Sequence, residues 1–102
     1  KQMDLTLTSK QRARLRALAN PLETILQIGK GGITENIVRQ VQDALTAREL
    51  IKIRVLKNSL YTAKEAGAQL AEEADCLVVQ VLGTRITLYR PNPKKPVIQL
   101  DE

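Results

Sequence analysis

The sequence has no histidine and only one cysteine, Cys76, among its 102 residues. Histidine is the commonest general base in enzymes and the commonest protein ligand of transition metals. A structural zinc site uses four Cys or His ligands, and a disulfide within the chain needs two cysteines, so both are effectively excluded. There are also no paired carboxylates near a glycine loop and no thiol motif. We therefore expect no catalytic residue, no metal and no cofactor.

Long apolar runs are missing as well. The longest are a handful of residues, whereas a membrane-spanning helix needs about 20. The first residues lack the apolar segment of a secretory signal, and Met3 is a plausible natural start. Cys76 leads into an apolar run, which is typical of a small buried side chain. We expect one domain over residues 1–102, with its core at 5–91 and an extended tail at 92–102, in the cytoplasm.

Positive charge is in excess. Sixteen Lys and Arg face eleven Asp and Glu, which gives a formal net charge of +5. A basic domain of this size favours a polyanionic partner: RNA, DNA or an anionic membrane surface.

Capping signals place three helices. Thr8 and Gln11 have the spacing of a capping box, and Asn20 before a proline ends that helix after about residue 19. Thr34 is placed to cap a second helix that runs to about residue 48. A third helix is expected over about 60–73, capped by Asn58 or Ser59.

Apolar alternation places four strands, at 24–28, 50–56, 77–82 and 85–90. Gly83 and Thr84 form a two-residue turn with glycine first, which is typical of a type II′ hairpin. A last short edge segment is expected at 97–100. The order α-β-α-β-α-β-β predicts an α/β domain with a mixed four-stranded sheet, although the strand order does not follow from the sequence.

The loop between the first strand and the second helix is rich in glycine. Gly29, Gly31 and Gly32 let another backbone approach closely, and Lys30 adds a positive charge at the tip. The helix after Thr34 offers unpaired N–H groups to a phosphate. We take residues 29–32 and Thr34 as candidate RNA contacts. The spacing fails to match a P-loop or a dinucleotide fingerprint. It matches the Gly-x-x-Gly turn with which KH domains clamp nucleotide backbone.

Basic residues gather in three further places: the first helix, the second strand with the residue after it, and the last strand, which carries Arg85 and Arg90. Four like charges fall within seven residues of the first helix, with no acid among them. Lys52 and Arg54 lie opposite the apolar face of the second strand, and Lys57 follows it. A basic face can simply be solvated, but we take these residues as candidate phosphate contacts: Lys10, Arg12, Arg14, Arg16, Lys52, Arg54, Lys57, Arg85 and Arg90.

Aromatic residues are nearly absent. Tyr61 and Tyr89 are the only two, with no Phe or Trp. RRM and OB domains stack bases on aromatic side chains, so this sequence offers almost no such platform. We expect contacts mainly to phosphate and sugar, with low sequence specificity and steep salt dependence.

Five motifs in order resemble the CRM domain, the chloroplast RNA splicing and ribosome maturation family, whose single-domain bacterial members are YhbY-like proteins. The resemblance covers about residues 5–91. The motifs are Leu7-Thr8-Ser9-Lys10-Gln11, Leu18-Ala19-Asn20-Pro21-Leu22, Ile28-Gly29-Lys30-Gly31-Gly32-Ile33-Thr34, Glu49-Leu50-Ile51-Lys52-Ile53, and Val81-Leu82-Gly83 with Leu88-Tyr89-Arg90-Pro91.

The resemblance implies an α/β fold similar to the C-terminal domain of bacterial translation initiation factor three. It also implies RNA binding through the Gly-x-x-Gly loop, residues 29–32, and nearby basic surface, including Lys10 and Arg14. As a short domain the chain resembles the bacterial members, which associate with precursors of the large ribosomal subunit.

The leading hypothesis is therefore a non-enzymatic factor that holds ribosomal RNA through its backbone. A general nucleic-acid binder and a ribosome-associated protein-interaction module remain the alternatives. No helix carries the Arg, Asn and Gln array of a reader of the DNA major groove.

Overall fold

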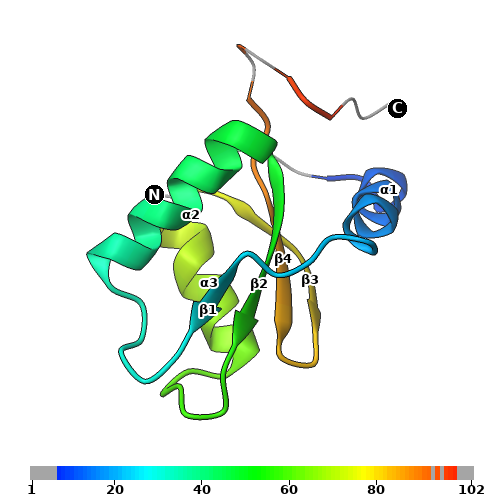
Figure 1. Cartoon of the computed structure of the whole chain (residues 1–102). Helices are drawn as coiled ribbons and strands as arrows, with labels where there is room; N and C mark the ends of the chain where they lie inside the picture. Colours follow the sequence, from blue (N-terminus) through cyan, green and yellow to red (C-terminus); the bar gives the residue numbers. More distant parts are fainter. Residues whose placement is uncertain (1–6, 93, 95, 99–102) are drawn as a thin grey trace.

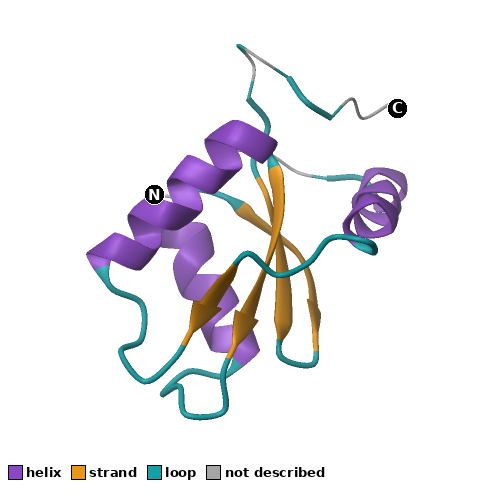
Figure 2. Cartoon of the chain, in the orientation of Figure 1, coloured by secondary structure: helices purple, strands orange, loops and turns teal. Residues whose placement is uncertain are grey.

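The seven expected elements are present in their expected order (Figures 1 and 2). The structure is a computed structural model that describes residues 7–92, 94 and 96–98. The elements are α1 (Ser9–Ala19), β1 (Leu26–Ile28), α2 (Glu35–Arg48), β2 (Leu50–Val55), α3 (Ala63–Glu73), β3 (Leu77–Leu82) and β4 (Arg85–Tyr89). Across the described residues, no helix is both long and apolar enough to cross a membrane.

The four strands form one mixed sheet in the order β1-β2-β4-β3. β1 pairs with β2 in parallel, and the other two pairings are antiparallel. Figure 1 shows α2 and α3 on one face of the sheet and α1 on the other. The predicted α/β architecture and mixed sheet are confirmed.

Two apolar clusters hold the layers together. The larger one joins α2 and α3 to the sheet through residues such as Leu45, Leu70, Ile53 and Ile86. The smaller one lies under α1 and consists of Leu15, Ala19, Leu50, Val79 and Tyr89. Because side chains alternate along a strand, the neighbours Leu50 and Ile51 enter different clusters.

Reciprocal capping boxes start two of the helices. The predicted box of Thr8 and Gln11 on α1 is confirmed, with both bonds 3.0 Å long. The prediction for α3 was wrong, because Thr62 and not Asn58 or Ser59 caps it. The Thr62 hydroxyl accepts from the Glu65 N–H at 3.1 Å, and the Glu65 carboxylate accepts from the Thr62 N–H at 2.9 Å. This reciprocal pair fixes the helix start three residues later than expected.

The predicted β3–β4 hairpin is also confirmed. Leu82 faces Arg85 across it, and Gly83 has a φ of +62°, so Gly83 and Thr84 form the two-residue turn. The expected edge segment at 97–100 is not a strand at residues 97–98, and residues 99–100 lie outside the described part of the chain.

Glu49 ties the C-terminal segment to the sheet instead. Its side chain is almost fully buried and accepts backbone hydrogen bonds from Asn92, Val97 and Ile98. The Glu49 carboxylate thus accepts from three backbone N–H groups that would pair with a neighbouring strand if this segment were an edge strand.

Candidate nucleic-acid interface

The glycine loop forms a tight turn between β1 and α2. The Gly32 N–H donates to the Gly29 carbonyl at 3.0 Å, which leaves Lys30 and Gly31 at the tip. Thr34 then caps α2, and its hydroxyl accepts from the Ile37 N–H at 3.2 Å. Lys30 and Gly31 are both exposed, so the tip of the turn faces solvent.

Gly31 and Gly32 differ in what the fold requires of them. Gly32 has a φ of +74°, and a Cβ placed there would lie 3.2 Å from the ring of Tyr61. Gly31 has no such φ, and among the described residues no atom beyond its chain neighbours lies within 4 Å of its Cβ position. The fold alone therefore requires glycine at position 32 but leaves position 31 open to a side chain.

The loop between β2 and α3, residues 56–62, lies beside this turn. The Leu56 N–H donates to the Ile28 carbonyl at 2.9 Å, and Tyr61 covers Gly32. The parallel register places Ile28 next to Val55, and the Val55 N–H donates to the Thr84 carbonyl at 2.8 Å. Both loops and the hairpin turn thus lie at one end of the sheet, which we call the loop end (Figure 1).

Three of the predicted basic residues lie together on the sheet. Arg54 and Arg85 are directly opposite each other in the antiparallel ladder, and Lys52 is two residues before Arg54 on the same face. This face is the one that α1 covers only in part, and both arginines are exposed. We call Lys52, Arg54 and Arg85 the basic strip. It runs toward the loop end, where Lys30 and Lys57 are also exposed.

Two of the predicted contacts, Arg12 and Arg90, each donate two or more hydrogen bonds within the protein, whereas Lys52 Nζ donates one longer bond, to the Asn20 carbonyl at 3.4 Å. The Arg12 guanidinium donates to the carbonyls of Val78 at 2.9 Å and Val79 at 2.8 Å, where the β3–β4 register shifts. Arg90 donates to three oxygens, on Ala74, Gln42 and Thr46, and so joins the ends of α2 and α3. We leave both arginines out of the candidate interface because these bonds explain their positions.

The remaining α1 residues are not brought to the loop end. Lys10 and Arg14 share one exposed side of α1, and Arg16 is exposed in its last turn. α1 contacts β2 and β3, whereas the glycine turn follows β1 at the edge of the sheet. The structure thus places these three away from the glycine turn, although the end of α1 reaches the basic strip, where Lys52 Nζ donates to the Asn20 carbonyl at 3.4 Å.

The helix N-terminus after the turn carries an acid of its own. Thr34 uses its hydroxyl in capping, and Glu35 occupies the first turn of α2. A carboxylate there already interacts with the positive end of the helix dipole. The turn and its lysine, rather than the helix end, are therefore the candidate anion contact.

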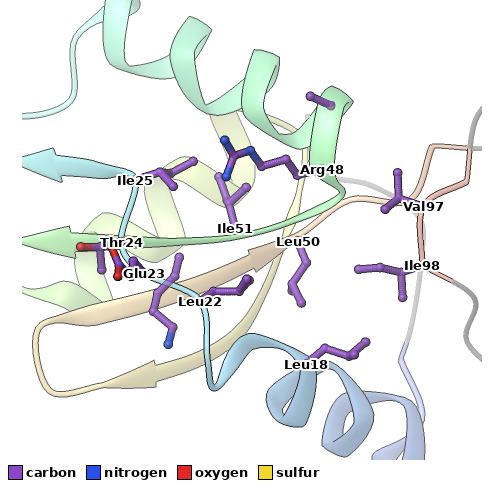
Figure 3. A pocket seen from close by; sticks show the side chains of 12 residues that line it. Leu18, Leu22, Glu23, Thr24, Ile25, Arg48, Leu50, Ile51, Val97 and Ile98 are labelled. Carbon is purple, nitrogen blue, oxygen red and sulfur yellow. The ribbon is translucent and has the colours of Figure 1, made fainter.

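A hollow lies at the opposite end of β2 and is lined mainly by aliphatic side chains (Figure 3). Its volume is about 650 Å³, and α1, the segment before β1, the end of α2 and residues 97–98 surround it. Leu18 of α1 is partly exposed and lines this hollow. Two cations, Arg48 and Lys52, and one acid, Glu23, lie among its mainly aliphatic walls, so it carries little net charge for a phosphate chain.

Cys76 is the one nucleophilic side chain of interest, and it is buried. Burial raises its pKa to about 12, and the thiol lies 3.6 Å from the Leu70 carbonyl. A thiol in this state stays protonated at neutral pH and is a poor nucleophile. Within the described residues, no group of three or more His, Cys, Asp or Glu side chains could hold a metal ion.

These features define a class: a small α/β domain of three helices and a mixed four-stranded sheet, with cationic side chains at one end of the sheet. Residues 7–90 match the family model of the CRS1 / YhbY (CRM) domain. The chain belongs to the CRM domain family.

Relatives of full domain length support this assignment. The chain is 38% identical over 94 residues to the Bacillus subtilis protein named "Probable RNA-binding protein YqeI", with 92% of this chain and 98% of that protein covered. It is 30% identical over 92 residues to a Haemophilus influenzae protein named "RNA-binding protein", covering 90% and 93%. A solution structure of a hypothetical Staphylococcus aureus protein, described as a candidate RNA binder, is 44% identical with a TM-score of 0.77, covering 94% and 100%.

Proposed function

We propose that this domain binds RNA through the loop end of its sheet and acts in the cytoplasm in the assembly of the large ribosomal subunit. The names of its bacterial relatives support RNA as the partner. The role is one of binding rather than catalysis: the turn at residues 29–32 contacts the phosphate backbone, and the basic strip extends that contact across the sheet.

The observation that carries the proposal is the presence of glycine at position 31, where neither the backbone angle nor the packing requires it. The fold does not require glycine there, because a Cβ at this position would meet no atom of the described protein within 4 Å beyond its own chain neighbours. A missing side chain at an exposed tip beside Lys30 is what close approach of a phosphate requires. The glycine is then explained by the ligand and not by the turn.

The charges set the expected salt dependence. Five exposed or half-exposed cations lie on the strip and its loops: Lys30, Lys52, Arg54, Lys57 and Arg85. If each neutralises one phosphate, the slope of log affinity against log salt is about −3.5 to −4.5. Affinity then falls roughly 100- to 500-fold between about 50 and 200 mM salt.

Fluorescence anisotropy tests the proposal with a structured ribosomal RNA fragment and a matched DNA duplex, each at two salt concentrations. The double variant Lys30→Asp/Gly31→Asp places two carboxylates at the tip and should abolish RNA binding while the fold persists. The control Ala47→Asp/Arg48→Asp makes the same charge change at the exposed far end of α2 and should bind nearly as the parent does.

Three results would count against the proposal. Equal losses in the two double variants would mean that net charge alone drives binding. Equal affinity for the DNA duplex would favour a general nucleic-acid binder. Affinity for ribosomal particles that survives high salt and the tip variant would favour a protein partner, and sedimentation with precursors of the large subunit tests this directly.

A further inference from the structure

The loop of residues 56–62 is held against the glycine turn by several contacts. The Leu56 N–H bonds the Ile28 carbonyl, and a Cβ on Gly29 would lie 3.4 Å from Leu56. The ring of Tyr61 covers Gly32, which is buried beneath it. The two loops are therefore fixed side by side, with the exposed tip of the turn next to the residues before Tyr61.

Leu60 lies in this loop and is 84% exposed, more than any other large hydrophobic side chain described. A single exposed leucine is common on protein surfaces. This one differs in its setting, because the exposed Lys57 and Lys30 lie on the same two loops. A phosphate bound by these lysines would place the rest of its nucleotide near Leu60.

The attached group in RNA has apolar surface. A nucleotide carries its phosphate, a ribose and a flat base, and a base face accepts an aliphatic side chain in the absence of aromatic platforms. In an A-form duplex the base faces are stacked and only edges and hydroxyls are accessible, so a base face is available only where the nucleotide is unpaired.

We propose that residues 57–62 form the second wall of the RNA site, and that Leu60 packs against an unpaired nucleotide next to the phosphate held at residues 30–31. Tyr61 is a positioning residue that keeps the glycine turn against this wall. The inference rests on the proposed RNA binding and adds the class of RNA: loops, bulges or single strands rather than continuous duplex.

The test compares Leu60→Ala with Val97→Ala, which truncates another exposed aliphatic side chain, 60% exposed and at the opposite end of the domain. The probes are an RNA hairpin with an unpaired loop and a fully paired RNA duplex of equal length. Leu60→Ala should weaken hairpin binding about three- to tenfold, as the loss of one aliphatic contact does. Duplex affinity and the hairpin's salt slope should stay unchanged, and Val97→Ala should bind as the parent does.

Lys30→Ala separates this inference from the function on which it rests. It should weaken binding to both probes and reduce the salt slope by about 0.7 to 0.9, as loss of one phosphate contact does. If Lys30→Ala has this effect while Leu60→Ala binds the hairpin as the parent does, the second wall is refuted and the RNA site stands. If neither variant changes binding, the RNA site itself is refuted.

Two further results complete the test. Equal losses on hairpin and duplex for Leu60→Ala would refute the preference for unpaired nucleotides. For Tyr61, the ring and not the hydroxyl contacts Gly32, so Tyr61→Phe should retain hairpin affinity and Tyr61→Ala should lose it. Loss in both variants would refute the positioning role.

Discussion

Replacement of Gly31 by alanine should improve folding and impair binding at once. The added methyl group has open space in the described protein, and the φ of Gly31 lies outside the left-handed region. Gly→Ala at a compatible position stabilises a protein by about 0.4–1 kcal/mol, because the unfolded chain loses conformational freedom. For a domain of this size that corresponds to a rise of about 2–8 °C in the melting temperature.

The same methyl group should interfere with a phosphate. Forcing one extra carbon into a close contact costs about 1–3 kcal/mol, which corresponds to a loss of roughly 5- to 150-fold in RNA affinity. Thermal unfolding and fluorescence anisotropy on the same preparation measure both effects. Few substitutions outside a binding site are expected to move the two quantities in opposite directions.

Gly32→Ala is the matched comparison one residue along. The φ of +74° makes alanine unfavourable by about 1–2 kcal/mol, and its methyl group would also crowd the Tyr61 ring at 3.2 Å. This variant should lose stability where Gly31→Ala gains it. If Gly31→Ala instead destabilises the domain, the turn geometry is wrong; if it is stable and binds RNA as the parent does, close approach at the tip is wrong.

Further substitutions separate stability from binding. Glu49→Ala removes the acceptor of three backbone N–H groups and should cost about 3 kcal/mol or more in urea unfolding, and an unchanged midpoint would contradict the tail contact. Arg90→Ala should cost about 2 kcal/mol while RNA affinity stays within about twofold, since its three bonds are internal. Arg85→Glu should raise stability by about 0.2–1 kcal/mol by pairing with Arg54, yet weaken RNA binding. Burial raises the Cys76 pKa from 9.0 to about 12, so the unfolded chain loses the thiol proton at a lower pH than the folded chain does. The contribution of Cys76 to the free energy of unfolding should therefore be constant below about pH 8 and fall between about pH 9 and 12. Urea titrations should show this fall, and Cys76→Ala should reduce it. A thiol reagent should reach Cys76 only as fast as the protein unfolds.

Features set by neighbours in the sequence were predictable. The α1 capping box, the β3–β4 turn and the alternation of β2 each depend on residues within a few positions of one another. The start of α3 was predicted wrongly although Thr62 and Glu65 also have the spacing of a capping box. Two polar residues earlier in the sequence, Asn58 and Ser59, were taken as the cap instead.

Partners distant in the sequence were not predictable. Arg12 has the same local signature as the other α1 cations, but its acceptors lie 66 and 67 residues away, at carbonyls that a register shift leaves available. The role of Glu49 likewise depends on amides more than 40 residues later. The charge at each position can be read from the sequence. The carbonyl oxygens that bind Arg12 and the N–H groups that bind Glu49 are identified only by the packed fold.

The strand order explains why the neighbour of the glycine turn was also missed. A sequence with helices between strands does not say that β2 lies between β1 and β4, so it does not say which loop follows the strand beside Ile28. Once β1 pairs with β2 in parallel, residues 56–62 must emerge next to residues 29–32. Tyr61 and Leu60 therefore become candidate site residues only in the fold.

Four arginines of this domain form two pairs that differ in what faces them. Arg12 and Arg90 meet carbonyl and hydroxyl oxygens within the protein, an arrangement that stabilises the free domain. Arg54 and Arg85 meet each other across an antiparallel ladder, where like charges are destabilising and an acid would be favourable. A polyanion lying across both would relieve that repulsion, so the pair costs stability in the free protein and contributes to affinity in the complex. That exchange, at the end of the sheet that also holds the exposed glycine tip, is the physical argument for the RNA site that we propose there.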